Sequence, residues 1–134
     1  MTIELWALFG VTAILWIAIF TQQIQADKVG GAKYALSNRE QGHQFKGATA
    51  LTGRLTRSVR NHVEGLMIFA PLVLIATATN VSNVWTQYAA IAYFMSRALH
   101  FLLYAAGITP FRSLAWAFGF FLATGGFVFG LVIG

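Results

Sequence analysis

The sequence predicts an all-α integral membrane protein, built as a bundle of four transmembrane helices. Hydrophobic residues make up 57% of the 134-residue chain and charged residues only 10%, against about 25% charged residues in a typical soluble domain. The apolar residues gather in four stretches, at positions 3–20, 63–79, 84–107 and 114–134. A helix needs about 20 apolar residues to cross the hydrocarbon core of a bilayer. Helices are expected because backbone polar groups in lipid must be hydrogen-bonded within their own segment.

A single domain covers residues 1–134, with helices predicted at about residues 3–21, 54–79, 84–107 and 112–133. The first is expected to be a retained helix, because Glu4 stands where a signal peptide has basic residues and no small-residue cleavage site follows. Pro71 is expected to kink the second helix. Small residues recur along the fourth in steps that suit close helix packing, within or between subunits: Ala115, Gly119, Ala123, Gly126, Gly130 and Gly134.

Residues 22–53 are predicted to form a cytoplasmic loop. Seven of the nine basic residues lie in this loop or just after it: Lys28, Lys33, Arg39, Lys46, Arg54, Arg57 and Arg60. Basic residues are enriched in cytoplasmic loops, so both termini and the turn at residues 80–83 are expected on the opposite side. The turn at residues 108–111 is then cytoplasmic. A basic connector between apolar spans also speaks against nucleic-acid binding, despite the net charge of +5.

The residues that commonly bind metals are few. The chain has no cysteine, which excludes disulfides, thiolate metal sites and a cysteine nucleophile. His43 and His62 have no carboxylate at ligand spacing and are expected at the surface. No metal site is predicted, because two isolated histidines do not make one.

Polar residues on three of the predicted helices indicate a site. They all fall in the cytoplasmic half of the bundle: Arg57, Asn61, Glu64, Arg97, His100, Tyr104 and Arg112. On the second and third helices they are three or four residues apart, which places each group on one helix face. Ionisable groups at membrane depth cost about 2.5–3.5 kcal/mol each on insertion scales, so they are usually buried in protein, paired and functional. The three faces are therefore expected to converge.

Such a set suits a small anionic ligand that also carries an amine. Arginines bind carboxylates, the Glu64 carboxylate binds an ammonium group, and the Asn61 amide binds peptide groups. Other interpretations remain open for single residues. Glu64 and Arg97 could form a structural ion pair, the basic residues Arg57 and Arg60 could be interfacial anchors, and Tyr104 could belong to an aromatic belt.

Two segments resemble signatures of the MAPEG family, the membrane-associated proteins in eicosanoid and glutathione metabolism. The first is RSVRNHVE, from Arg57 to Glu64, followed by the tripeptide FAP that ends at Pro71. The second is RALHFLLY at residues 97–104, followed by a short turn and the pair Arg112 and Ser113. The second segment is most similar to the microsomal prostaglandin E synthase branch, whereas the short chain and loop resemble bacterial members. The resemblance covers all four predicted helices.

The resemblance implies a homotrimer that binds glutathione as cosubstrate between neighbouring subunits, on the cytoplasmic side of a bacterial inner membrane. By position it implies glutathione binding by Arg57, Asn61, Glu64, Arg97, His100 and Tyr104. It implies that Arg112 stabilises the glutathione thiolate and that Ser113 assists. A free thiol has a pKa of about 8.5 and a neighbouring cation lowers it, which supplies the nucleophile. The implied function is a membrane-bound glutathione transferase or peroxidase acting on lipophilic electrophiles or lipid hydroperoxides.

The sequence also departs from the family pattern. Gly65 stands where several relatives carry tyrosine or another polar residue, and an aspartate that the prostaglandin branch carries before the second helix has no counterpart. Prostaglandin synthesis is therefore not inferred. Two functions of other classes remain open: a non-catalytic membrane scaffold or accessory subunit with the same fold, and a small multidrug antiporter. Arginines beside Glu64 would oppose the cation binding that an antiporter needs.

Overall fold

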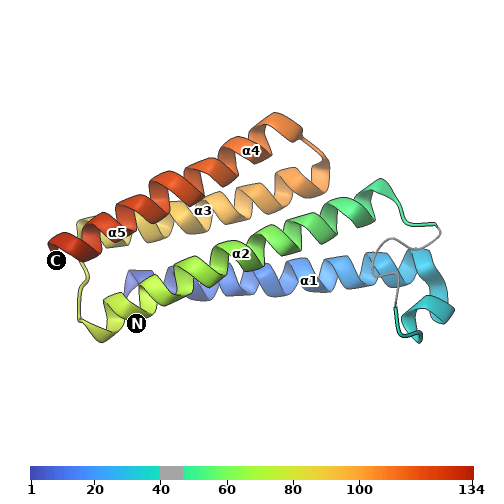
Figure 1. Ribbon diagram of the computed structural model, residues 1–134, viewed down its shortest axis with the longest axis horizontal. Coiled ribbons are helices and arrows are strands. Elements are labelled where there is room, and N and C mark those ends of the chain that lie inside the picture. Colours follow the sequence, from blue (N-terminus) through green and yellow to red (C-terminus); the bar gives the residue numbers. More distant parts are fainter. Residues whose placement is uncertain (40–46) are drawn as a thin grey trace.

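The computed structural model describes residues 1–39 and 47–134, and these residues form four long helical segments that run up and down along one axis (Figure 1). They are α1 (Ile3–Ala35), α2 (Ala50–Ala78), α3 (Val84–Ala106) and a fourth segment made of α4 (Thr109–Ala117), the π-helix η1 (Phe118–Ala123) and α5 (Thr124–Ile133). Each segment is long and apolar enough to cross a membrane. The predicted all-α, multi-pass membrane bundle is confirmed.

The central element of the bundle is α3, which packs against α1, α2 and the whole fourth segment. Both chain termini lie at one end of the bundle, together with the turn between α2 and α3 (Figure 1). The end of α1, the start of α2 and the turn from α3 to α4 lie at the opposite end. Residues from α2, α3 and α4 can therefore meet at this second end. This agrees with the expectation that the polar faces of three helices converge on one site.

An apolar core fills the middle of the bundle. The Phe69 ring stacks on the Tyr93 ring with 4.0 Å between centroids, and it meets the Phe127 ring edge-on at 5.6 Å. Val11 and Val73 are fully buried in the same core. Many other large apolar side chains point outward, which is the arrangement that lipid favours because it solvates them as well as a core does.

Local signals set the length of α3. The Asn83 side chain accepts hydrogen bonds from the backbone N–H groups of Trp85 and Thr86 at 3.0 and 3.1 Å, and the Asn83 N–H donates to the Thr86 hydroxyl at 3.0 Å. This is a capping box, which starts a helix at a defined residue. The helix stops at Gly107, whose φ of 79° lies in the left-handed region that favours glycine. The polar residues of α3 are thus held in one register.

The predicted bounds of the loop at residues 22–53 are wrong at both ends, because α1 continues to Ala35 and α2 begins at Ala50. Gln22 and its neighbours favour helix, and the Gln22 amide donates to the Thr56 hydroxyl of α2 at 3.3 Å. The helix is interrupted only at Gly31, where φ is 72°. The fourth segment likewise begins at Thr109 and not at residue 112, with a proline in its first turn. Predictions for His43 and Lys46 lie outside the described residues.

The small residues of the fourth segment face α3 of the same chain. A Cβ added at Gly126 would lie 3.7 Å from the Ala89 Cβ, and one added at Gly130 would lie 2.9 Å from the Thr86 backbone nitrogen. Ala115 and Ala123 are buried on the same face. From the sequence, these small residues could pack within one subunit or between subunits. In the described residues they pack against α3 of the same subunit.

Candidate functional site

A pocket of about 290 Å³ lies near the end of the bundle where α3 turns into α4. Its walls come from α2, α3 and α4: Asn61, His100, Tyr104, Arg112, Ser113 and Trp116. Five of the eight residues proposed from the sequence thus line one cavity, and Trp116 joins them. The other three, Arg57, Glu64 and Arg97, do not line it, and the structure places each of them differently.

Tyr104 organises two arginines at this pocket. The Arg57 Nε donates a hydrogen bond to the Tyr104 hydroxyl at 3.3 Å. The Arg112 guanidinium carbon lies 4.3 Å from the centroid of the Tyr104 ring, a cation–π contact. The His100 ring meets the same ring edge-on, with 5.3 Å between centroids. One phenol therefore holds a guanidinium at its hydroxyl and another at its face.

Arg97 lies behind the pocket, inside the bundle. It is only 1% exposed, and its Nη2 donates to the Trp116 carbonyl oxygen at 3.5 Å. Its guanidinium carbon lies 5.5 Å from the centroid of the Tyr93 ring. Arg97 thus contacts the pocket wall through the backbone of Trp116, and it places a positive charge close behind that wall.

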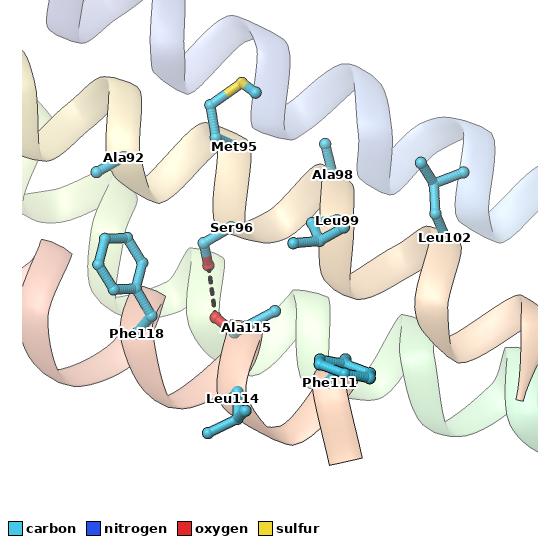
Figure 2. A pocket seen from close by; sticks show the side chains of 10 residues that line it. All are labelled: Ala92, Met95, Ser96, Ala98, Leu99, Leu102, Phe111, Leu114, Ala115 and Phe118. Carbon is cyan, nitrogen blue, oxygen red and sulfur yellow. Dashed lines mark hydrogen bonds between the residues drawn. The ribbon is translucent and has the colours of Figure 1, made fainter. Parts of the chain in front are cut away.

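The fourth segment makes room for Arg97. Just after α4 the backbone adopts the π-helix η1, a form that changes which carbonyl oxygens are used within the helix. Two carbonyl oxygens in this region accept hydrogen bonds from α3. The Trp116 carbonyl accepts from Arg97, and the Ala115 carbonyl accepts from the Ser96 hydroxyl at 3.0 Å (Figure 2). Gly119 is required here, because a Cβ on it would overlap the Ser96 hydroxyl and lie 3.3 Å from the Arg97 Nη2.

Glu64 points away from the pocket. Its carboxylate pairs with the Arg60 guanidinium at 2.9 Å, and the two side chains are 56% and 81% exposed. The ion pair between Glu64 and Arg97 that the sequence left open is therefore not formed. Glu64 follows Asn61 by three residues, which rotates it about 60° around the helix axis, and this rotation carries it to the outer face of α2.

His62 was expected at the surface, and this expectation is wrong. The side chain is fully buried, and its ring centroid lies 6.2 Å from that of His100. The spacing in the sequence offered a partial signal, because the buried residues of α2 recur in steps of three and four and include both polar and apolar types: Thr52, Leu55, Ser58, His62, Gly65, Phe69 and Val73. Steps of three and four back from Phe69 lead to His62, so helical periodicity, and not residue type, identifies the buried face.

The charges around the pocket are unbalanced. Of the four acidic residues in the chain, Glu64 pairs with Arg60 and Asp27 with Arg39. Glu4 is buried near the opposite end of the bundle, where its carboxylate accepts from the Ser82 and Thr86 hydroxyls at 3.0 and 2.6 Å, and Glu40 lies outside the described residues. Within the described residues, then, the cations at residues 57, 97 and 112 have no carboxylate partner. Cations at membrane depth require counter-charge, so the arrangement suits an anionic ligand.

A second cavity, of about 700 Å³, lies between α3 and α4 (Figure 2). Its rim is made of apolar residues such as Met95, Leu99 and Phe111, which are 50–61% exposed on the bundle surface. The Ser96 hydroxyl in its wall is already bonded to the Ala115 carbonyl oxygen. None of the residues proposed from the sequence lines this cavity, so the polar chemistry belongs to the smaller pocket.

Comparison with known proteins identifies the family. A family model for the MAPEG family matches residues 3–132, a range that includes the whole pocket and all four helical segments except the last residue of α5. Searches of curated proteins and of solved structures return no match. Because the family model matches nearly the full length of the chain, this protein belongs to the MAPEG family.

Proposed function

We propose that this chain is a membrane-bound, glutathione-dependent transferase or peroxidase that presents the glutathione thiolate to apolar electrophiles or lipid hydroperoxides. The observation that carries the proposal is the pocket in which Arg112 and Ser113 meet Asn61, His100 and Tyr104, with no carboxylate of the described residues on its wall. Membership of the MAPEG family supports a membrane function related to glutathione.

In this proposal the arginines bind the carboxylates of glutathione. Arg57 stands at the rim of the pocket through its bond to Tyr104, where a bidentate contact with a carboxylate can form. The Asn61 amide binds peptide groups of the ligand. Arg97 contributes its charge from behind the wall, because it is buried and its Nη2 is directed to the Trp116 carbonyl.

Arg112 and Ser113 act on the sulfur. A guanidinium beside the thiol favours the thiolate over the thiol. The Ser113 hydroxyl, which donates weakly to the Thr109 carbonyl at 3.4 Å, can turn to donate to the sulfur instead. The thiolate then forms a carbon–sulfur bond with an electrophile as the leaving group departs. With a hydroperoxide the thiolate takes the terminal OH group as the O–O bond breaks, and the alkoxide that leaves gains a proton from water to become the alcohol. A second glutathione thiol then converts the sulfenic acid to a disulfide and water.

The proposal includes assembly as a homotrimer with shared sites. Arg57, Arg60 and Glu64 are exposed on α2 in the single chain, and charged groups facing lipid at membrane depth are costly. The pocket of about 290 Å³ is also at the lower end of ligand-binding cavities, which are about 300–1,000 Å³. A neighbouring subunit covering this face of α2 would complete the site and bring Glu64 to the ammonium of glutathione.

The proposed orientation puts the pocket at the cytoplasmic face of a bacterial inner membrane. Basic residues lie on the segments at the pocket end of the bundle, among them Lys28, Lys33 and Arg54, and this distribution is typical of cytoplasmic loops. Glutathione from the cytoplasm would then reach the pocket from water, while an apolar cosubstrate would arrive through the bilayer.

Calorimetric titration of the purified protein in detergent with glutathione tests the proposal. Binding is expected, together with thiolate absorbance in the ultraviolet at neutral pH and conjugation of a small apolar electrophile. Lys28→Ala is a matched control, because it removes an exposed cation that does not line the pocket. A protein that neither binds glutathione nor shows the thiolate signal would be a non-catalytic scaffold with the same fold.

A further inference from the structure

The end of the bundle at which both termini lie contains a small cavity of about 160 Å³. Its wall comes from the start of α1, the end of α2 and the turn that leads to α3 (Figure 1). The residues that line it are Thr2, Glu4, Ala76, Thr77, Asn80, Val81 and Ser82. None of them has a role in the proposed function.

Glu4 is the charged residue of this cavity, and it is only 1% exposed. Its carboxylate accepts a hydrogen bond of 2.6 Å from the Thr86 hydroxyl, a length typical of a hydroxyl bonded to an ionised carboxylate. The Ser82 hydroxyl lies 3.0 and 3.3 Å from the two carboxylate oxygens. Because Ser82 accepts from the Gln87 amide at 3.2 Å, its own hydrogen is available to Glu4. The carboxylate therefore accepts from both hydroxyls, as an anion does.

The negative charge of Glu4 has no counter-charge in the described part of the chain. Its hydrogen-bond partners there are neutral hydroxyl and amide groups, and neither ion pair of the described residues includes it. The starts of α1 and α3 supply partial positive charge, but α2 ends at the same cavity with the opposite polarity. Hydrogen bonds satisfy the oxygens without neutralising them, and a buried charge is costly unless it is paired.

The rest of the cavity wall offers oxygen atoms as ligands. The Thr77 hydroxyl donates its hydrogen to the Val73 carbonyl at 2.9 Å, and the Ser82 hydroxyl donates to Glu4. Both hydroxyl oxygens therefore have lone pairs available for another partner. The side-chain amide of Asn80, which also carries an oxygen, lines the same cavity. Carboxylate, hydroxyl and amide oxygens are the ligands that hard cations prefer.

The site suits a small cation of single charge. One carboxylate balances one positive charge, and the described residues contain no group of three or more His, Cys, Asp or Glu side chains that could hold a transition metal. The cavity of about 160 Å³ has about five times the volume that one water molecule occupies in the liquid, so a sodium ion with some of its water fits. Thr77 and Asn80 are exposed, which gives the ion a way in from water.

We propose that this cavity binds a small monovalent inorganic cation such as sodium, with the Glu4 carboxylate as counter-charge and the Thr77 and Asn80 oxygens as further ligands. The ion contacts the start of α1 and the end of α2, and Glu4 is bonded in turn to Ser82 and Thr86 at the start of α3. It therefore stabilises the arrangement of three helix ends. The site is separate from the thiolate chemistry, so the inference does not depend on the proposed function.

Thermal unfolding of the full-length protein in detergent, without glutathione, tests the inference. Sodium chloride should raise the midpoint temperature by about 5 °C relative to N-methylglucamine chloride at equal ionic strength, and the rise should saturate with concentration. Both salts supply chloride, so anion binding at the arginines cancels in the comparison. Equal midpoints in the two salts would overturn the proposal, because the carboxylate would then be stable with its hydrogen bonds alone.

Two substitutions locate the ion. Glu4→Gln keeps the shape of the side chain and removes its charge, so the response to sodium should be lost. Thr77→Val removes one oxygen ligand and leaves the hydrogen bonds of the carboxylate in place, which makes it the deciding variant if Glu4→Gln does not fold. The sodium concentration that gives half of the effect should rise about fivefold in Thr77→Val.

Thr12→Val is the matched control for Thr77→Val. The Thr12 hydroxyl likewise donates to the carbonyl four residues earlier, that of Leu8, at 2.9 Å, and it does not line the cavity. This variant should respond to sodium as the wild type does. A wild-type response in either Glu4→Gln or Thr77→Val would place the ion elsewhere and overturn the proposed site.

Discussion

Tyr104 shows at the scale of one residue how a side chain can have two separable roles. Its hydroxyl accepts from Arg57, whereas its ring face carries Arg112. The two arginines are proposed to do different things, since one binds a carboxylate and the other stabilises the thiolate. Substitutions that remove one contact and keep the other can therefore separate binding from activation.

Tyr104→Phe removes the hydroxyl and keeps the ring. The 3.3 Å hydrogen bond from Arg57 is lost, and a hydrogen bond of this kind contributes about 0.5–1.5 kcal/mol. Glutathione affinity measured by calorimetry should fall about two- to twelvefold, while the thiolate absorbance of the bound ligand should persist. Loss of the thiolate signal with unchanged affinity would contradict this division of roles.

Arg112→Ala should mainly lower the rate of conjugation, whereas Arg57→Ala should mainly lower the affinity for glutathione. Without Arg112 the sulfur loses its cation, so conjugation at saturating glutathione should fall about a hundredfold and much of the affinity should remain. Without Arg57 the affinity should fall first, because a carboxylate contact is present in both ground state and transition state. Steady-state kinetics with both substrates varied gives the comparison, and equal effects of the two variants would argue against separate roles.

At the scale of elements, the fourth segment is shaped to receive α3. Its small residues face α3, and η1 lies beside the carbonyl oxygens that accept from Ser96 and Arg97. A buried arginine needs space as well as partners, and the missing Cβ of Gly119 supplies that space. The stripe of small residues thus contributes to the site by letting two helices approach at Arg97.

Gly119→Ala should therefore be destabilising. The new Cβ would overlap the Ser96 hydroxyl and crowd Arg97, and overpacking of this kind costs about 1–3 kcal/mol. Gly125→Ala is the matched control, since a Cβ there has no atom within 4 Å, and alanine favours helix by up to about 1 kcal/mol. Thermal unfolding in detergent should give a lower midpoint temperature for Gly119→Ala than for Gly125→Ala. Adding Ser96→Ala to Gly119→Ala should recover part of the loss, and no recovery would mean that Ser96 is not the obstacle.

At the scale of the whole molecule, the up-and-down arrangement sends both termini to one end and the pocket toward the other (Figure 1). An even number of spans makes this unavoidable. The direction in which the bundle crosses the membrane depends on the basic residues of the connector between α1 and α2, which favour the cytoplasm.

The orientation can be measured with single cysteines, because the chain has none of its own. Lys33→Cys should resist an impermeant thiol reagent in intact cells, and Gly134→Cys should react with it. Permeabilised cells should label both, which controls for burial. The reverse pattern in intact cells would move the pocket to the other side of the membrane.

The assembly can be measured by native mass spectrometry in mild detergents. The trimer belongs to the proposed function and was inferred from the family resemblance; the charged outer face of α2, which carries Arg60 and Glu64, gives a physical reason for a subunit contact there, because it should be covered in the membrane. A protein that stays monomeric in every mild detergent would count against a shared site. It would also leave Glu64 without a route to the ligand.

The fold class and most of the pocket could be predicted from the sequence. Apolar stretches of membrane length must become helices, so the class and the number of spans follow from how apolar residues are distributed along the chain. Spacing of three and four then placed His100 and Tyr104 on one face of α3, and both line the pocket. The family match also agrees with the resemblance carried by residues 57–64 and 97–104.

Tertiary structure decided which of these residues face inward. Asn61, His62 and Glu64 occupy a single turn of α2, yet the first lines the pocket, the second is buried behind it and the third is exposed. Periodicity defines the angles between side chains on one helix, but the rotation of that helix about its own axis is set by what it packs against. For α2 these are α1 and α3, and in the contact with α3 Gly65 leaves the space that the Tyr93 hydroxyl fills. Local spacing places His62 on the same face of α2 as Phe69, and Glu64 off that face, but a long-range contact decides which face turns inward, and for this reason only the folded chain shows that His62 is buried.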